Sequence, residues 1–254
     1  DESLQKEISE TITILKKPIK EPYAVASLFS KKQTKSLASG IIPTKKKQST
    51  LHRLMLFIRG NFFIPDARIF WVQPSVDFLS DYILNNQIET VITTGPPHSI
   101  HLIGLALKAR LKVKWIADFR DPWTTIGYHK SLKLMAYAKK KHQKLEHSVL
   151  NEAHHIIVTS PATKKEFASK TDKPITVITN GYDVSHNSKI EKANNFVLAH
   201  IGSLLSERNP ETLWKVLAEL IATNTEFKNS FRLELAGVIS DAVLTSIKSF
   251  GLRP

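Results

Sequence analysis

The sequence of 254 residues contains no cysteine, no long apolar run and comparatively few acidic residues. The absence of cysteine excludes a disulfide framework and any metal site built on thiolates. No apolar run approaches the ~18 residues that a helix needs to span a bilayer. Hydrophobic residues still make up 42% of the chain and charged residues 23%, so the composition indicates a globular core and neither disorder nor a fibrous repeat.

Basic residues outnumber acidic residues by 36 to 23, which gives a formal net charge of +13 and a pI near 9.8. Such a surface attracts polyanions: nucleic acid, anionic lipid head groups or nucleotide-linked substrates. Six lysines and no acidic residue lie in residues 30–50, which indicates an exposed loop, and Lys139 begins a second run of three lysines. The hypothesis that the protein binds nucleic acid rests on charge alone, because the sequence has no RNP, KH or zinc-finger pattern.

Short apolar runs alternate with amphipathic stretches from about residue 73 onward. The apolar runs are rich in Ile and Val, as is typical of strands that helices cover on both faces. They predict strands at residues 91–94, 113–117, 156–159, 175–179, 197–201 and 233–236.

Three amphipathic stretches, at residues 98–111, 128–153 and 212–222, gather apolar residues on one face and predict helices. Ser160 and Asn209, each followed by a proline, predict helix caps, because proline favours the first helical position. Strands that alternate with helices indicate an α/β fold built from Rossmann-like, doubly wound parallel sheets.

The N-terminal part of the sequence is less regular. Residues 11–15 predict a strand and residues 23–29 a short helix. Residues 54–63 mix leucine, isoleucine and phenylalanine with arginine, a composition that suits either a membrane interface or the ordinary core packing of a short helix. Near an anionic bilayer each lysine contributes ~1 kcal/mol to binding, so the lysine runs favour a membrane surface as much as a nucleic acid.

A polar stretch at residues 184–195 lacks any repeating apolar pattern and places a domain boundary there. The sequence therefore predicts one domain in residues 1–185 and the start of a second in residues 186–254. Both ends of the sequence read as cut, so we expect a longer parent protein.

Unusual residues follow four of the predicted strands. In open parallel sheets, ligands bind at the carboxyl ends of the strands, so these residues are expected to share one edge of the molecule. They form four groups: Gly95 with His98 and His101; Asp118, Arg120, Asp121 and Trp123; Asn180 and Gly181; and Gly202 with Arg208.

Each group in the first domain allows two interpretations. Gly95 opens a Gly-Pro-Pro run that is either a stiff turn or part of a substrate site. His98 and His101 suit polar contacts or proton transfer better than metal binding, because a third ligand is not apparent. Arg120 between two aspartates forms either a local ion-pair cluster or a site that orients a sugar hydroxyl, and Trp123 offers a face for a sugar ring.

The remaining groups suit a turn and an anion. Asn180 and Gly181 predict a tight turn that leads toward the crevice between the domains. Gly202 lets the backbone approach a ligand closely, and a following helix start offers free N–H groups to an anion. Arg208 supplies a matching charge, unless it is an ordinary surface arginine.

Several longer motifs follow one another along the chain. They are RGNFFIPD (59–66), TTGPPHS (93–99), HLIG (101–104), WIADFRDPWT (115–124), LE (145–146), VL (149–150) and VITNGYD (177–183). In these motifs and in their order, the chain resembles a subgroup of bacterial glycosyltransferases of family four, and the resemblance covers nearly the whole chain.

This resemblance implies a GT-B architecture, in which an acceptor-side domain precedes a nucleotide-sugar domain. It implies transfer from a nucleotide-sugar donor with retention of the anomeric configuration, without a cofactor or bound metal. It also implies a cell-surface polysaccharide, lipopolysaccharide or lipid-linked acceptor, and a cytoplasmic location, peripheral at the inner face of the membrane. No nucleic acid is expected as a partner of such an enzyme; the alternative is a non-catalytic scaffold or a basic protein that binds nucleic acid or a membrane.

Carried over by residue, Gly202 and Arg208 match the glycine and the basic position of the family's donor-diphosphate loop. Ser203 stands where arginine is common, which puts one diphosphate contact in doubt. Arg120 falls near the position of a catalytic histidine in many relatives, so Asp121 or His98 is expected to take that role. The family's first strand and its paired-glutamate motif are not in this sequence, so the 254-residue chain alone is expected to be inactive.

Overall fold

The computed structural model describes residues 9, 11–19, 50–126, 129, 132–181 and 195–252. These residues fall into two compact units, one that ends at Gly181 and one that contains the described residues from 195 onward. The predicted helix at 23–29, the lysine-rich residues 30–49 and most of the predicted boundary at 184–195 lie outside the described residues.

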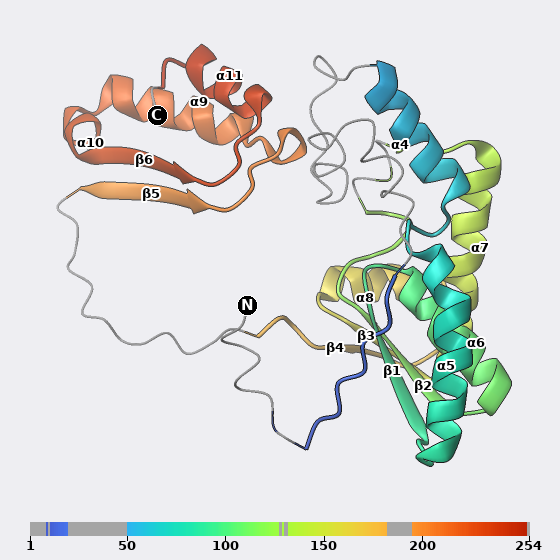
Figure 1. Cartoon of the computed structure of the whole chain (residues 1–254). Helices are drawn as coiled ribbons and strands as arrows, with labels where there is room; N and C mark the ends of the chain where they lie inside the picture. Colours follow the sequence, from blue (N-terminus) through green and yellow to red (C-terminus); the bar gives the residue numbers. More distant parts are fainter. Residues whose placement is uncertain are drawn as a thin grey trace. The chain divides into compact units, whose positions relative to one another are not determined.

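Four parallel strands form the sheet of the first unit, in the order β1-β2-β3-β4 (Figure 1). They confirm the predicted parallel α/β fold and each of the four strands expected in this part of the chain. The strands are β1 Thr90–Gly95, β2 Lys114–Phe119, β3 His155–Val158 and β4 Ile175–Val177. The register pairs Gly95 with Phe119 and Phe119 with Val158, so three strands end at the same level.

Helices α6 (Ser99–Leu111), α7 (Ala136–Glu152) and α8 (Pro161–Ala168) connect consecutive strands. Because parallel crossovers are right-handed, a sequential strand order brings all three helices to the same face of the sheet. The core on that face joins alternate residues of β2 to the helices. Its fully buried members are Trp115, Ala117, Phe119, Trp123, Val149, Leu150, Ala153, Ile156, Val158 and Phe167. On the opposite face, Ile92 and Ile178 are more than half exposed.

Before the sheet come α4 (Thr50–Phe62), the short 3-10 helix η2 (Ile69–Trp71) and α5 (Val72–Asn85). Helix α5 packs against α6 through a second apolar cluster, which buries Val76, Ile83, Ile103, Leu107 and Val113. A pocket of about 250 Å³ lies between these helices and the outer edge of β1. Among the described residues that line it, none belongs to the predicted site.

The strand predicted at residues 11–15 is wrong, because residues 12–19 have neither helical nor strand structure. Ile12 and Ile14 are more than half exposed, whereas Leu15 and Lys17 line the pocket beside β1. The Nζ atom of Lys17 lies 5.0 Å above the ring centre of Phe78, so this segment is held by side chains and not by a strand ladder.

The predicted helix boundaries are confirmed in part. Ser160 caps α8 as expected, since its hydroxyl accepts the N–H of Thr163 at 3.1 Å. The prediction for Asn209 is wrong: its side-chain oxygen accepts the indole N–H of Trp214 at 2.7 Å, and helix α9 begins one residue after Pro210. A buried indole N–H requires an acceptor, and this requirement takes the side chain that would otherwise cap the helix.

The second unit contains two parallel strands, β5 (Phe196–Ile201) and β6 (Phe231–Ala236), as predicted. Its helices are η4 Ser206–Arg208, α9 Glu211–Thr223, α10 Thr225–Ser230 and α11 Asp241–Ser249. Trp214, Leu217, Val243 and Ile247 form the centre of its core. No helix within the described ranges of either unit is long and apolar enough to cross a membrane.

Candidate functional site

The backbone of Arg120 joins the carboxyl ends of three strands. Its N–H donates to the carbonyl of Gly95 at 2.8 Å, and its own carbonyl accepts the hydroxyl of Thr159 at 3.0 Å. These bonds fix the start of the loop after β2 between the ends of β1 and β3. The prediction that the groups after β1 and β2 share one edge is therefore confirmed by geometry.

The side chain of Arg120 extends this connection to the end of β4. Its Nη2 atom donates to the side-chain oxygen of Asn180, and its Nη1 atom lies 3.8 Å from Oδ2 of Asp118. Asp118 is 8% exposed, and its Oδ1 atom has no hydrogen-bond partner among the described residues. A buried acceptor without a partner at the rim of a sheet is a natural contact for a ligand hydroxyl.

Gly95 is required at its position by the imidazole of His101. A Cβ atom at Gly95 would lie 2.7 Å from Nε2 of His101, closer than real contacts allow. The His101 ring is fully buried, stacks 4.2 Å from the ring centre of Phe119 and shares a 2.9 Å hydrogen bond between Nδ1 and Thr93. His101 therefore acts on the site through packing, beneath the turn that follows β1.

His98 and Trp123 form a parallel stack, with ring centres 4.8 Å apart and an interplanar angle of 2°. His98 is 2% exposed and Trp123 is 0% exposed. The indole N–H of Trp123 donates to Nδ1 of His142 at 3.2 Å. In this arrangement the Trp123 ring has no open face for a sugar, so the stack joins the turn after β1 to the loop after β2.

Burial keeps the histidines of this region neutral. It lowers the pKa of His101 to about 3 and holds the pKa of His98 well below its usual value of 6.5. Burial lowers the pKa of His129 to about 4, and repulsion from His142, whose ring centre is 4.7 Å away, lowers it further. Burial lowers the pKa of His142 as well. Neutral imidazoles suit a packed interior, where a charged ring would lose its hydration.

Asp66, the last residue of the RGNFFIPD motif, holds the start of α6. Its carboxylate accepts the N–H of Ser99 at 2.8 Å and the Ser99 hydroxyl at 2.9 Å. It also accepts the N–H of Arg68 at 2.9 Å. A carboxylate at the first turn of α6 satisfies a free N–H and stabilises the helix dipole, so Asp66 anchors the turn that holds His98.

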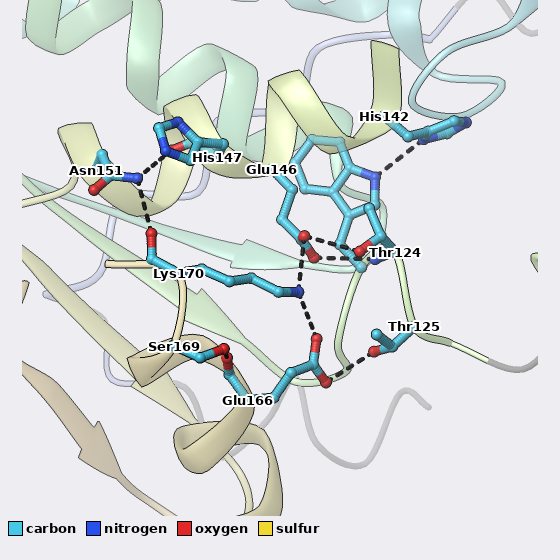
Figure 2. A network of polar contacts seen from close by, with 10 residues as sticks. Thr124, Thr125, His142, Glu146, His147, Asn151, Glu166, Ser169 and Lys170 are labelled. Atoms are coloured by element: carbon cyan, nitrogen blue, oxygen red, sulfur yellow. Dashed lines mark hydrogen bonds and ion pairs between the residues drawn. The ribbon is translucent and has the colours of Figure 1, made fainter. Parts of the chain in front are cut away.

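Glu146 of α7 holds the loop after β2 through Thr124 (Figure 2). This carboxylate is 3% exposed; it accepts the Thr124 N–H at 3.0 Å and the Thr124 hydroxyl at 2.8 Å. Lys170 completes the set, because its Nζ atom lies 3.0 Å from Glu146 and 2.7 Å from Glu166. Burial opposes the charge of Lys170, but its bonds to the two glutamates outweigh that effect and raise its pKa.

Glu166 continues this network to the next residue of the loop. Its Oε2 atom accepts the hydroxyl of Thr125 at 2.9 Å (Figure 2). Carboxylates of α7 and α8 therefore bind Thr124 and Thr125 by hydrogen bonds. These two threonines follow the exposed Asp121 by three and four residues. The sequence analysis placed Glu146 and Thr124 in two of the motifs but gave them no role, because a contact across 22 residues leaves no signal in the sequence.

The second unit contains the residues predicted for a donor diphosphate. Gly202 follows β5 with a φ of 132°, a conformation that favours glycine, and its N–H donates to Ala236 at 2.8 Å. A Cβ at Gly237 would lie 2.1 Å from the Gly202 carbonyl, so two glycines allow the ends of β5 and β6 to approach. Arg208 is exposed and ends the 3-10 helix η4.

Gly181, the last residue of the predicted acceptor-side group, is exposed, and a Cβ there would meet nothing within 4 Å. Throughout the described part of the chain, no group of three or more histidines, aspartates or glutamates is arranged to hold a metal ion. Seven of the eleven predicted site residues thus meet around Arg120 and the His98–Trp123 stack. They are Gly95, His98, His101, Asp118, Arg120, Trp123 and Asn180.

Two comparisons with known proteins complete this description. A search of curated proteins finds no match to the chain. The model of the family described as Glycosyltransferase Family 4 matches residues 46–186, more than half of the chain, including β1 to β4 and the whole cluster around Arg120. On this match, the chain belongs to glycosyltransferase family 4.

Proposed function

We propose that the parent enzyme transfers a sugar from a nucleotide-sugar donor to a cell-surface polysaccharide or lipid-linked acceptor, with retention of configuration. Membership of the family supports the transferase chemistry. The observation that carries the proposal is the convergence at Arg120, whose backbone and side chain connect the ends of all four strands. Such a rim of fixed polar groups suits the recognition of sugar hydroxyls.

On the acceptor side, Asp121 is the carboxylate that we assign to catalysis. It is exposed, and the loop that carries it is held at both ends, by Arg120 and by the Glu146 network. A general base must reach the proton it removes, and His98 at 2% exposure is far less accessible. His98 then contributes by supporting the loop through its stack with Trp123.

Four further residues are assigned to acceptor binding. Asp118 offers an unpartnered carboxylate oxygen, and Arg120 offers guanidinium N–H groups beside it. The side-chain oxygen of Asn180 accepts a hydrogen bond from Arg120. Gly181 leaves space for a ligand, because a Cβ there would meet nothing within 4 Å. Carboxylate, amide and guanidinium groups together supply both acceptors and donors for sugar hydroxyls.

On the donor side, Gly202 and Arg208 are assigned to the diphosphate. A Cβ at Gly202 would meet nothing within 4 Å, and Arg208, six residues further on, carries an exposed positive charge. Backbone N–H groups and an arginine are the usual partners of a diphosphate. We place the enzyme in the cytoplasm at the inner face of the membrane, where nucleotide sugars and lipid-linked acceptors meet.

The test is an assay of nucleotide release by the full parent reading frame with a panel of nucleotide sugars and a membrane extract as acceptor source. We expect turnover with one class of donor. Asp121→Asn is expected to abolish it, and Arg208→Ala to raise KM for the donor. His98→Ala tests whether a buried histidine supports the loop. Glu219→Gln, which alters an exposed residue of α9, is the control and should leave turnover unchanged.

Two results would change the assignment. Full activity in Asp121→Asn would remove that residue from catalysis. A folded parent protein without turnover with any donor would favour a non-catalytic scaffold. The 254-residue chain, assayed in parallel, is expected to release no nucleotide.

A further inference from the structure

One face of α4 carries a row of exposed apolar side chains. Leu54, Ile58 and Phe62 are spaced four residues apart, which aligns them along the helix, and they are 52%, 39% and 69% exposed. We call these three residues the α4 stripe. A monomeric soluble surface seldom leaves such a row open, and contiguous exposed apolar residues mark interaction sites.

The rest of α4 is used for packing, so the stripe is not part of the core. Leu56 is 2% exposed, and a Cβ at Gly60 would lie 2.8 Å from Leu134. Asn61 is also buried; its oxygen accepts the N–H of Met135 at 2.7 Å, which fixes the start of α7 beside the last turn of α4 (Figure 1). Tyr137 in the first turn of α7 is 67% exposed and adds an aromatic ring to this region.

The chain segments that form and adjoin the stripe carry basic residues and no acidic residue. Helix α4 and residues 132–145 contain no acidic residue. Their exposed basic residues are Arg53, Lys133, Lys139, Lys140, Lys141 and Lys144. The carboxylates that come next in the sequence, Asp66 and Glu146, are occupied by Ser99 and Thr124. An apolar row bordered by lysines complements the surface of an anionic bilayer, in which acyl chains lie beneath phosphate groups.

We propose that the α4 stripe and the lysines at the start of α7 dock this domain on a membrane that contains anionic lipid. The side chains of Ile58 and Phe62 enter the boundary between head groups and acyl chains, and the lysines contact the phosphates. A nucleic acid fits less well, since its phosphates gain nothing from an apolar row. The inference rests on the proposed function in one respect: a lipid-linked acceptor gives the docking its purpose.

Vesicle flotation with the 254-residue chain and with the full parent protein tests the proposal. We expect binding to vesicles of phosphatidylcholine with phosphatidylglycerol to exceed binding to pure phosphatidylcholine by about tenfold, and to weaken as salt is added. The double variant Ile58→Ser/Phe62→Ser should lose about tenfold in binding. Its control is Leu84→Ser, which alters an apolar side chain at the end of α5 that is 63% exposed.

A matched pair of variants tests the charge. Lys139→Gln/Lys140→Gln should reduce binding several-fold, whereas Lys164→Gln/Lys165→Gln, which removes the same charge from α8, should not. Binding that survives the stripe variant, or that falls equally in both lysine pairs, would overturn the proposal. Self-association that the stripe variant abolishes, measured by light scattering, would assign the stripe to a second copy of the chain.

Vesicle binding and sugar transfer are measured separately, so their failures are distinguishable. Docking without turnover would remove the proposed function alone. Turnover without docking would remove this inference alone.

Discussion

Glu146 and Thr124 are joined by two hydrogen bonds, one to the Thr124 N–H at 3.0 Å and one to its hydroxyl at 2.8 Å. A buried carboxylate thereby fixes the loop that carries Asp121. Because Lys170 is bonded to the same carboxylate, removing the charge of Glu146 takes one of two carboxylates from Lys170, which keeps its 2.7 Å contact with Glu166, and weakens the bonds to Thr124.

Glu146→Gln is therefore expected to lower the free energy of unfolding by about 1–3 kcal/mol, as measured by urea denaturation. Glu219→Gln is the matched control, since its pair with Lys215 spans 3.8 Å on an exposed helix face and should change stability by less than about 0.5 kcal/mol. Equal effects in the two variants would show that the Glu146 network does not stabilise the loop.

Stability is expected to fall as the pH is lowered from 7 to 5. In the unfolded chain histidine has a pKa near 6.5, whereas in the folded protein burial lowers the pKa of His101 to about 3 and of His129 to about 4. Below pH 6.5 the unfolded state binds more protons, so each of these histidines removes about 1.4 kcal/mol per pH unit until the folded pKa is reached. Burial lowers the pKa of His98 and His142 too, which adds to the slope.

Urea denaturation at several pH values measures this slope. His101→Gln should reduce it by the share of one histidine between pH 6 and pH 4. A stability that stays constant between pH 7 and pH 5 would show that these rings bind protons as readily in the folded protein as in the unfolded chain.

Gly95→Ala is expected to destabilise the protein by about 1–3 kcal/mol, because the new Cβ atom meets Nε2 of His101 at 2.7 Å. Gly181→Ala is the control: its Cβ atom meets nothing within 4 Å, and it should change stability by less than about 1 kcal/mol. Thermal unfolding of the two variants gives the comparison, and a neutral Gly95→Ala would mean that His101 moves aside freely.

Arg120 and Asn180 are expected to act as one unit in the parent enzyme. Arg120→Ala and Asn180→Ala each remove the contact between the ends of β2 and β4, so each should lower kcat/KM by a similar factor. The double variant should then be little worse than either single variant, which is the signature of coupled residues. Strictly additive losses in this double-mutant cycle would indicate that the two side chains contact the substrate independently.

The strands were predictable from sequence because they depend on local composition. Runs such as residues 113–117 and 197–201 are mostly apolar and contain β-branched residues; the first overlaps β2 and the second falls within β5. Residues 11–15 have the same composition but pair with no strand among the described residues, since a strand also needs a neighbour. Local composition therefore predicts where a strand is favourable, and not whether its partner is present.

The site was predictable at the level of its location, because parallel strands bring their carboxyl ends to one edge. The contacts that organise it were not, since they join distant residues: Asp66 to Ser99 across 33 positions and Glu146 to Thr124 across 22. The burial of individual side chains could not be predicted from the sequence either. Trp123 reads as a sugar platform in the sequence, yet it stacks on His98 with no exposed surface.

The short path from Phe62 to Asp66 limits how far the site can lie from the α4 stripe. Four residues span at most ~14 Å when fully extended, and the Asp66 carboxylate is bonded directly to Ser99, next to His98. Under the proposed docking, which places Phe62 in the head-group region, a lipid-linked acceptor would have to extend only a few sugar rings above the bilayer to reach the rim of the sheet. The proposed docking would therefore limit the length of the acceptor. A chain whose growing end lies much farther from its lipid would have to bend back to reach the site.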